Sequence, residues 1–272
     1  MSRFVQQSEA QSPELLQQFL ARHHIDRATD PFALLKQLAT TYAQLPYENL
    51  SKILRDHQTK DSDEVRRLPA EVLSDYYRLG TGGTCFSLTW TLLHLIRALG
   101  FETEPILADR RYGPDTHCAL VVWIDGVKHL LDPGYLLVDA MAFPKNNELI
   151  VPTSFHEVKL SPDQAGERVQ LHTIHQNQST YRLTYKTDPV DTSQFLKAWD
   201  ASFQFEMMQY PVLSRISRGK QYYLQKNKLL IRGKETSEQR ELEPAKMVET
   251  IHHLFGIDPS VAGKTLQLLR QP

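Results

Sequence analysis

A cysteine that directly follows a glycine-rich turn is the first residue in this sequence whose type and position could do chemistry. Cys85 comes after the segment 80–84, Gly-Thr-Gly-Gly-Thr, and stands where an apolar helix is expected to begin. A helix N-terminus presents unpaired N–H groups and a partial positive charge, and both favour a thiolate over a thiol. The same N–H groups could bind the oxyanion of a tetrahedral intermediate. Cys85 is therefore a candidate nucleophile, with a small buried apolar residue as the alternative.

The imidazole and carboxylate that such a cysteine needs follow from the register of a predicted hairpin. Asp125-Gly126 lies between two apolar runs and is a strong signal for a two-residue turn. With these residues at the tip, Ala119 faces Asp132, and His117 shares a face with Asp132, diagonally across the ladder. A carboxylate on one imidazole nitrogen leaves the other nitrogen to serve a thiol. The pattern predicts a Cys–His–Asp centre.

The same register makes a second prediction and has a structural alternative. Side chains alternate along a strand, so Cys118 is expected on the face opposite His117 and outside the site. A strand-end histidine and a turn-capping aspartate would explain His117 and Asp132 without chemistry. A β-bulge would change the register and remove the argument.

The elements that must position these residues change type along the chain. Helices are predicted in the first third, starting at Ser12-Pro13 and Asp30-Pro31, and running over 69–77 and 85–99. Short runs rich in branched apolar residues then predict strands of an antiparallel sheet or small barrel, at 104–108, 118–124, 127–131, 155–160, 168–174 and 181–186. A hairpin at 221–225 and 228–232 and a helix over 244–255 are expected near the end. Domain boundaries are expected near residues 100 and 195.

Composition excludes several classes of protein. Of 272 residues, 41% are hydrophobic, and 31 Lys and Arg stand against 32 Asp and Glu, so no nucleic-acid partner is expected. No segment has the roughly 20 apolar residues that span a bilayer, and the first residues do not resemble a signal peptide. Only two cysteines are present, and neither belongs to a Cys-x-x-Cys pair, so neither a disulfide framework nor a metal site is predicted. The expectation is a cytoplasmic globular protein that does not bind membranes.

Several motifs, in order, resemble the arylamine N-acetyltransferase family. The segment 82–86, Gly-Gly-Thr-Cys-Phe, is similar to the family's Arg-Gly-Gly-x-Cys-Phe-Glu, and Thr116-His117 and 132–135, Asp-Pro-Gly-Tyr, match its histidine and aspartate motifs. The segments 46–50, Pro-Tyr-Glu-Asn-Leu, and 254–257, Leu-Phe-Gly-Ile, are also similar to the family's. The resemblance runs from about Leu15 to Ile257.

The resemblance implies a fold and a reaction. The fold is α+β, with an N-terminal helical bundle (1–100) that carries the nucleophile, a central antiparallel β-barrel (101–195) that carries the histidine and aspartate, and a C-terminal α/β lid (196–272). The reaction is a ping-pong acyl transfer in which Cys85 takes acetyl from acetyl-CoA, as a co-substrate, and passes it to a small arylamine or hydrazine. His117 would be the general base and acid, oriented by Asp132. Substrate contacts are expected at Phe86, Gly134, Tyr135 and Phe203, with core packing as the alternative for the aromatic side chains.

The sequence also departs from the family, and other functions stay open. Thr81 stands where the family usually has arginine, Thr84 where an aromatic residue is common, and Ser87 where glutamate is preferred. The alternatives are a cysteine hydrolase or amide synthase with the same three residues, and a non-enzymatic binding protein on the same fold. The segment 109–112, Asp-Arg-Arg-Tyr, is expected in a loop that is either solvated or in contact with coenzyme phosphates.

Overall fold

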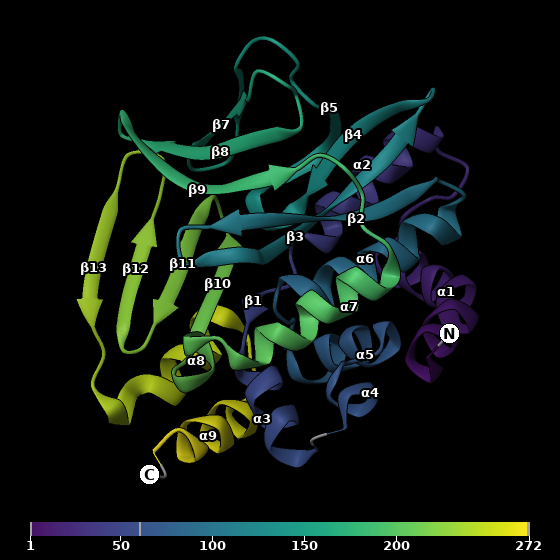
Figure 1. Cartoon of the computed structure of the whole chain (residues 1–272). Helices are drawn as coiled ribbons and strands as arrows, with labels where there is room; N and C mark the ends of the chain where they lie inside the picture. The colour runs from purple at the N-terminus through teal and green to yellow at the C-terminus, as the bar shows by residue number, and fades with distance from the viewer. Residues whose placement is uncertain (1, 60, 271–272) are drawn as a thin grey trace.

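Helices fill most of the first hundred residues in this computed structural model, which describes residues 2–59 and 61–270 (Figure 1). The bounds are α1 (Arg3–Arg22), α2 (Pro31–Tyr42), α3 (Leu50–Gln58), α4 (Ser62–Val65), α5 (Pro69–Leu79) and α6 (Cys85–Leu99), with a two-residue strand, β1 (Tyr47–Glu48), before α3.

Helix α6 is the centre of this region. Its side chains are apolar on nearly every face, as expected for a buried helix, and Trp90, Leu93 and Ile96 are each no more than 1% exposed. It packs against α1, α2 and α5 on one side and against two strands on the other. Gly100 ends it with a left-handed backbone, φ 99°. Cys85, the first residue of α6, is therefore held by a rigid element.

The predicted start of the first helix is wrong. Helix α1 begins at Arg3, capped by Ser2, and Pro13 lies inside it. The extra turns are stabilised by tertiary packing, because the Phe4 ring stacks on Trp90 with the ring centroids 5.8 Å apart. Burial of this ring offsets the one helical hydrogen bond that Pro13 cannot donate.

The middle of the chain forms an eight-stranded antiparallel sheet that curls into a nearly closed barrel. Its order is β5-β4-β3-β2-β9-β8-β7-β6. The strands are β2 (Thr103–Arg110), β3 (Gly113–Ile124), β4 (Val127–Asp132), β5 (Leu137–Ala142), β6 (Leu149–Pro152), β7 (Glu157–Pro162), β8 (Arg168–His175) and β9 (Gln178–Lys186). Side chains of β3 alternate between two cores: Ala119 and Val121 face the barrel interior, whereas Cys118 and Leu120 face the helices.

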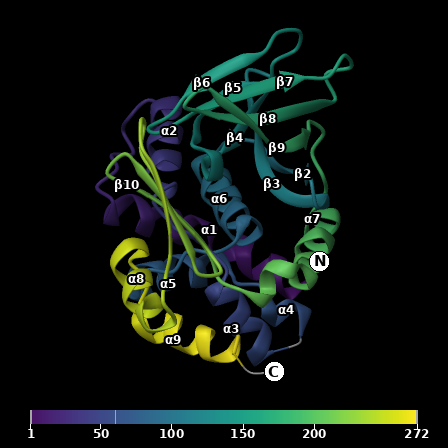
Figure 2. The same cartoon turned by 90° about the vertical axis from the view of Figure 1, so that its left-hand side faces the viewer.

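The last part of the chain adds α7, a second sheet and two helices. A five-stranded sheet has the order β1-β10-β11-β12-β13, so its edge strand β1 comes from the N-terminal region. Helices α8 and α9 lie at one end of this sheet, and α9 packs against α3 (Figure 2). The bounds are α7 (Thr192–Ala201), β10 (Val212–Ser217), β11 (Lys220–Gln225), β12 (Lys228–Arg232), β13 (Ser237–Glu241), α8 (Met247–Phe255) and α9 (Pro259–Leu268).

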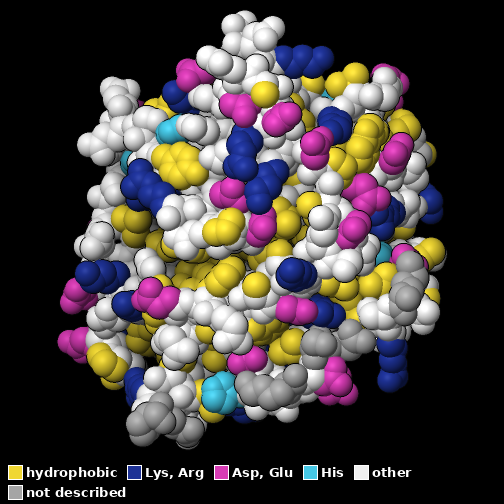
Figure 3. Space-filling view, in the orientation of Figure 1, with side chains coloured by type: hydrophobic (Ala, Val, Ile, Leu, Met, Phe, Trp, Pro, Cys, Tyr) yellow, Lys and Arg dark blue, Asp and Glu magenta, His cyan; other side chains and the backbone are white. Residues whose placement is uncertain are grey.

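The predicted α+β class, with N-terminal helices, a central antiparallel barrel and a C-terminal sheet with helices, is confirmed. The boundaries at 100 and 195 remain a prediction. Within the described residues, no helix is long and apolar enough to cross a bilayer. Figure 3 shows hydrophobic side chains gathered in a hollow across the middle of one face, between the barrel and the lower helices.

Candidate functional site

The turn before Cys85 is fixed by steric contacts that only glycine allows. A Cβ at Gly82 would lie 1.8 Å from the Pro46 carbonyl oxygen, and one at Gly83 would lie 2.2 Å from Ser87 Oγ. Thr84 is extended and the α-helix starts at Cys85, whose side chain is half-buried. The cysteine therefore occupies the helix N-terminus that the sequence predicted.

The segment 46–50 ties this turn to the C-terminal sheet. The Gly83 N–H donates to the Pro46 carbonyl at 3.3 Å, and the Glu48 N–H donates to the Gly83 carbonyl at 2.9 Å. Asn49 continues the connection, since its side-chain amide donates to the carbonyl of Met207 at 2.6 Å and its Oδ1 accepts from the Val212 N–H at 2.8 Å. The nucleophile turn thus sits between the helices and the C-terminal sheet.

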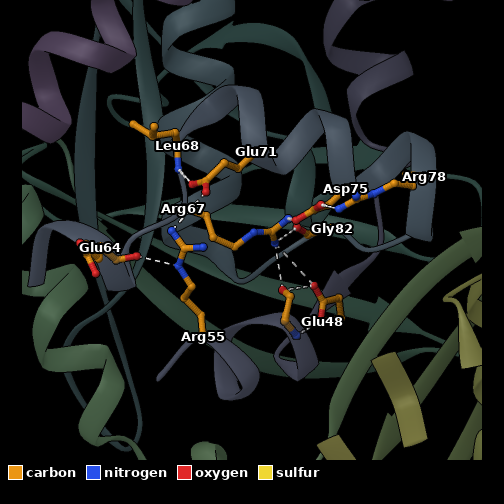
Figure 4. Close-up of polar contacts among 10 residues, drawn as sticks. Glu48, Arg55, Glu64, Arg67, Leu68, Glu71, Asp75, Arg78 and Gly82 are labelled. Atoms are coloured by element: carbon orange, nitrogen blue, oxygen red, sulfur yellow. Dashed lines mark hydrogen bonds and ion pairs between the residues drawn. The ribbon is translucent and has the colours of Figure 1, made fainter. Parts of the chain in front are cut away.

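An arginine outside the recognised motifs supports the turn (Figure 4). The Arg67 guanidinium donates to the Gly82 carbonyl at 2.8 Å and to Ser51 Oγ at 2.9 Å, and it pairs with Asp75 at 3.0 Å. It also lies 4.0 Å from the fully buried carboxylate of Glu48. Arg67 thus supplies a buried cation at this turn. The family usually has an arginine at position 81 of the turn itself, where this chain has Thr81.

Sequence reasoning missed Arg67 because it lies in a different segment from the turn. The one available signal was indirect. A buried Glu48 needs a cationic or hydrogen-bonding partner, and Thr81 cannot provide a charge. Two consecutive arginines, Arg66 and Arg67, precede α5.

The hairpin register that joined His117 to Asp132 is confirmed. Asp125 and Gly126 both have positive φ, 51° and 74°, and the pairs run from Ile124 opposite Val127 to Leu120 opposite Leu131 without a bulge.

His117 and Asp132 are each 3% exposed and hydrogen-bonded to one another. His117 Nε2 lies 2.7 Å from Asp132 Oδ2. The same oxygen accepts from the Tyr185 hydroxyl at 2.7 Å, and Oδ1 accepts from the Gly134 N–H at 3.1 Å. The carboxylate is thus fixed by three partners, and it can hold the imidazole in one orientation.

The other imidazole nitrogen faces the cysteine. Nδ1 lies 3.0 Å from an Arg110 nitrogen, and the imidazole and the Cys85 thiol interact closely enough to shift the pKa of each other. Because a guanidinium can only donate, Nδ1 accepts in this arrangement and Nε2 carries the proton that it donates to Asp132. This tautomer is the one that can take a proton from a thiol. The structure therefore brings Cys85, His117 and Asp132 together in one chain of contacts.

The expectation that Cys118 lies outside the site is wrong. Its side chain does point away from the face of His117, as the register requires, but α6 packs on that opposite face. The Cys118 thiol packs in the same cluster as Cys85 and lowers its pKa. The Cys118 carbonyl accepts from Thr89 Oγ1, one turn after Cys85, at 3.4 Å. The alternation of side chains along β3 predicted the direction of the Cys118 side chain. It could not predict that α6 packs on that face.

The pKa values of Cys85 and His117 move in opposite directions. The hydrogen bond from Cys118 contributes most to the lowered pKa of the Cys85 thiol, followed by the hydrogen bond and charge of His117, against the opposing effect of burial. Burial acts to lower the pKa of His117, but the charge and hydrogen bond of Asp132 and the contact with Cys85 raise it. Both shifts favour transfer of the thiol proton to His117, and a proton on Nδ1 requires the Arg110 donor to move away from that nitrogen.

The four predicted substrate contacts lie in different surroundings. The Tyr135 ring meets the His117 ring edge to face at 5.5 Å, and Gly134 is exposed beside Asp132. Phe203 lies under the Lys52 ammonium, 4.2 Å from its ring centroid. Phe86 is 1% exposed and packs its ring on Phe195 in the helical core. A role in substrate binding remains a prediction for all four.

The segment 109–112 is only in part the solvated loop expected for it, since Arg111 and Tyr112 form an exposed turn but residues 109 and 110 do not. Strand β2 continues to Arg110, and Asp109 forms ion pairs with Arg168 and Lys186. The Arg110 side chain turns inward to His117 rather than out to solvent. Across the described part of the chain, no group of three or more histidine, cysteine or acidic side chains is arranged to hold a metal ion.

This α+β fold places Cys85 at the start of α6 and His117 and Asp132 on the barrel, and a known protein family matches the chain over most of its length. A family model described as N-acetyltransferase matches residues 32–263. The chain belongs to this family, and its resemblance to the arylamine N-acetyltransferases is confirmed. No curated protein sequence matches the chain significantly.

Solved structures of arylamine N-acetyltransferases share the fold. That from Mycobacterium abscessus is 20% identical, with a TM-score of 0.78 over 94% of this chain and 95% of that chain. The Mycobacterium marinum enzyme, in complex with CoA, is 18% identical, with a TM-score of 0.75 over 93% and 99%. A Bacillus cereus enzyme, described as having a Cys-His-Glu catalytic triad, is 16% identical, with a TM-score of 0.70 over 90% and 98%.

Proposed function

We propose that this protein transfers an acyl group, acetyl from acetyl-CoA in the first instance, through a thioester on Cys85 to a small arylamine or hydrazine. The observation that carries the proposal is the His117–Asp132 hydrogen bond of 2.7 Å next to a Cys85 thiol whose pKa His117 lowers. Membership of an N-acetyltransferase family supports the choice of reaction.

The proposed first half-reaction loads the cysteine. His117 Nδ1 takes the thiol proton, and the Cys85 thiolate attacks the thioester carbonyl of the donor. The N–H groups at the start of α6 stabilise the oxyanion. The carbon–sulfur bond to CoA then breaks, and the CoA sulfur leaves with the proton from His117.

In the proposed second half-reaction, the acyl group passes from Cys85 to the amine. The amine attacks the acyl-cysteine carbonyl while His117 takes a proton from nitrogen, and the bond to Cys85 breaks. His117 returns that proton to the cysteine sulfur, so the free enzyme is restored. Asp132 keeps the imidazole oriented and stabilises its positive charge in both halves.

The surroundings of the cysteine support a working site. Arg67 braces the turn where Thr81 departs from the family pattern. Tyr135, which lies beside His117, is the best placed of the four proposed substrate contacts, and Gly134, Phe203 and Phe86 are proposed together with it. A structural relative from Mycobacterium marinum was solved with CoA, which supports a CoA thioester as donor. We propose a cytoplasmic location, where CoA thioesters are available.

Steady-state kinetics with both substrates varied test the proposal. Wild-type protein is expected to release CoA from acetyl-CoA at a rate that depends on an added arylamine or hydrazine, with parallel lines in double-reciprocal plots. Cys85→Ser serves as the inactive control. If the rate of CoA release did not depend on any added amine, water would be the acceptor and the protein would be a hydrolase. No release from any thioester would contradict the proposal.

A further inference from the structure

The two cysteines of this chain meet where helix α6 packs on strand β3. Cys85 is the first residue of α6, and Cys118 points from β3 toward the helices. Thr89 lies one helical turn after Cys85 on the same face, and its hydroxyl contacts the Cys118 carbonyl at 3.4 Å. The Cys118 thiol therefore lies against the first turn of α6, beside the proposed nucleophile.

The two thiols act on each other more than packing alone would require. Of the effects on the pKa of Cys85, that of Cys118 is the largest and lowers it, while burial and then Cys85 raise the pKa of Cys118. The other side chains on this face of β3, Leu120 and Val122, are branched and apolar. A thiol thus occurs on this face at the one position that meets Cys85, where an apolar side chain would serve the core equally well.

Exposure and acidity make the two sulfurs unlike. Cys85 is half-buried, so a small solute can reach it, and its lowered pKa favours the thiolate that reacts with oxidants. Cys118 is 1% exposed, and its raised pKa keeps it a thiol. An accessible cysteine of low pKa next to a protected second cysteine is the arrangement of a redox-sensitive site.

We propose that hydrogen peroxide converts Cys85 and Cys118 into a reversible disulfide, which inactivates the nucleophile and protects it from irreversible oxidation. Neither residue has another partner within the chain, because the sequence contains two cysteines. The proposal does not depend on acyl transfer, since it concerns only the two sulfurs. It gives Cys118 a role of its own as the cysteine that completes the disulfide.

The reaction balances in two steps. The Cys85 thiolate attacks one oxygen of hydrogen peroxide, the O–O bond breaks, and the departing hydroxide takes the proton that Cys85 had given up, which leaves water and a sulfenic acid on Cys85. The Cys118 sulfur then attacks the Cys85 sulfur, the S–O bond breaks, and the departing hydroxide takes the Cys118 proton to form a second water. Peroxide gains two electrons, and each sulfur loses one. A dithiol such as dithiothreitol reverses the change by exchange.

The packing of helix on strand favours this bond. A disulfide requires Cα atoms within about 7 Å of each other and sulfur atoms about 2 Å apart. The contact between Thr89 and the Cys118 carbonyl holds β3 against this turn of α6. Rotation of the two side chains is therefore expected to bring the sulfurs together while helix and strand stay in place.

Intact mass spectrometry of the full chain tests the proposal. Reduced protein is treated with hydrogen peroxide near neutral pH and denatured in excess iodoacetamide, with and without prior reduction by dithiothreitol. After peroxide, wild-type protein is expected to lose both alkylatable thiols and to retain no added oxygen, and dithiothreitol should restore both thiols. Peptide mapping without reduction should find the Cys85 peptide joined to the Cys118 peptide.

Variants assign the protection to Cys118. In Cys118→Ala and Cys118→Ser, dimedone should trap the sulfenic acid on Cys85, and excess peroxide should carry it to sulfinic acid, which dithiothreitol does not reverse. Val122→Ala alters the same face of β3 without touching a thiol, so this matched control should form the disulfide as the wild type does. In Cys85→Ser, Cys118 should stay reduced because it is buried.

The other outcomes overturn the proposal. Wild-type protein that retains oxygen on Cys85, or that joins two chains through Cys85, would show that no internal disulfide forms, and this result needs no variant. Equal recovery of the Cys85 thiol in the wild type and in both Cys118 variants would show that Cys118 does not protect the nucleophile. Acylation by acetyl-CoA is measured separately on reduced protein, so its failure would overturn the proposed function and leave the disulfide proposal standing.

Discussion

At the scale of single residues, the chemistry of this site depends on reciprocal effects between neighbours. His117 and Cys118 both stabilise a thiolate on Cys85, and Asp132 stabilises the imidazolium on His117. These shifts favour a thiolate on Cys85 and an imidazolium on His117, and no further base is needed to form them. The period of two along a strand was enough to predict His117 and Asp132 on one face.

The same reasoning could not predict the roles of Cys118 and Arg110. Cys118 meets Cys85 because α6 covers the outer face of β3, and Arg110 reaches His117 because β2 runs two residues further than its apolar run. Both facts depend on how elements pack. No local pattern in the sequence contains that information.

Because its pKa is lowered, Cys85 is expected to react with iodoacetamide at a lower pH than an ordinary cysteine does. A depressed thiol pKa means that thiolate, and with it alkylation, is already present below the ordinary midpoint of about pH 8.5. The rate should rise with pH through the lowered value and level off above it. Mapping of the modified peptide separates Cys85 from buried Cys118.

The variant His117→Ala should move this midpoint to higher pH, because the hydrogen bond and charge of the imidazolium are lost. His129→Ala, in the same hairpin, is the control and should leave it in place. A wild-type midpoint at or above the ordinary thiol value would contradict the ion pair.

At the scale of elements, the nucleophile turn depends on segments far from it in sequence. Strand β1 pairs with β10 and also bonds Gly83, so the turn, the helices and the C-terminal sheet meet at residues 46–49. The glycine-rich turn and the helix after it could be predicted from local signals. Their support by Arg67 could not, because a side chain from the start of α5 crosses to the turn.

Removal of the Arg67 guanidinium is expected to lower both the stability of the protein and the reactivity of Cys85. Arg67→Ala would leave the Glu48 carboxylate buried and weakly compensated, at a cost of about 3 kcal/mol in the free energy of unfolding measured with urea. Acylation of Cys85 should slow as the turn loosens. Arg67→Lys should recover little, since an ammonium cannot bond Gly82, Ser51 and Asp75 together.

Arg78→Ala is the matched control, because Arg78 pairs with the same Asp75 from an exposed position. We expect it to change the free energy of unfolding by less than about 1 kcal/mol. Equal losses for Arg67→Ala and Arg78→Ala would show that Arg67 does not brace the turn.

At the scale of the whole molecule, three hydrophobic clusters among residues 2–59 and 61–270 hold the chain together. One joins the helices to the outer face of β2 and β3, one fills the barrel, and one lies between the C-terminal sheet and α8 and α9. The sequence predicted α2, α5, α6 and α8 and most of the central strands from their periodic apolar residues. The first turns of α1 were not predicted, nor were α3, α7, α9, β1, β5, β6, β10 and β13.

A buried histidine in the helical core predicts how the whole molecule responds to acid. Burial lowers the pKa of His94 from 6.5 to about 4, and its Nδ1 hydrogen-bonds with Ser12 at 2.9 Å. The unfolded chain therefore binds a proton at a higher pH than the folded one. Stability should fall as pH drops from 6.5 to about 4, by about 3 kcal/mol from this residue.

The free energy of unfolding measured across this pH range tests the assignment. His94→Gln keeps a hydrogen-bond partner for Ser12 but cannot titrate, so its pH dependence should be shallower than that of the wild type. His253→Gln, at an exposed position of α8, should retain the wild-type slope. An unchanged slope in His94→Gln would contradict the role given to this residue.

The central claim is that Cys85 carries the acyl group, and intact mass spectrometry after mixing with acyl-CoA tests it most directly. The wild-type protein should gain one acyl group, peptide mapping should locate it on Cys85, and a later addition of arylamine should remove it. Cys85→Ser should gain no such group. An acyl group located elsewhere, or none from acetyl-CoA or any other acyl-CoA thioester, would contradict the account.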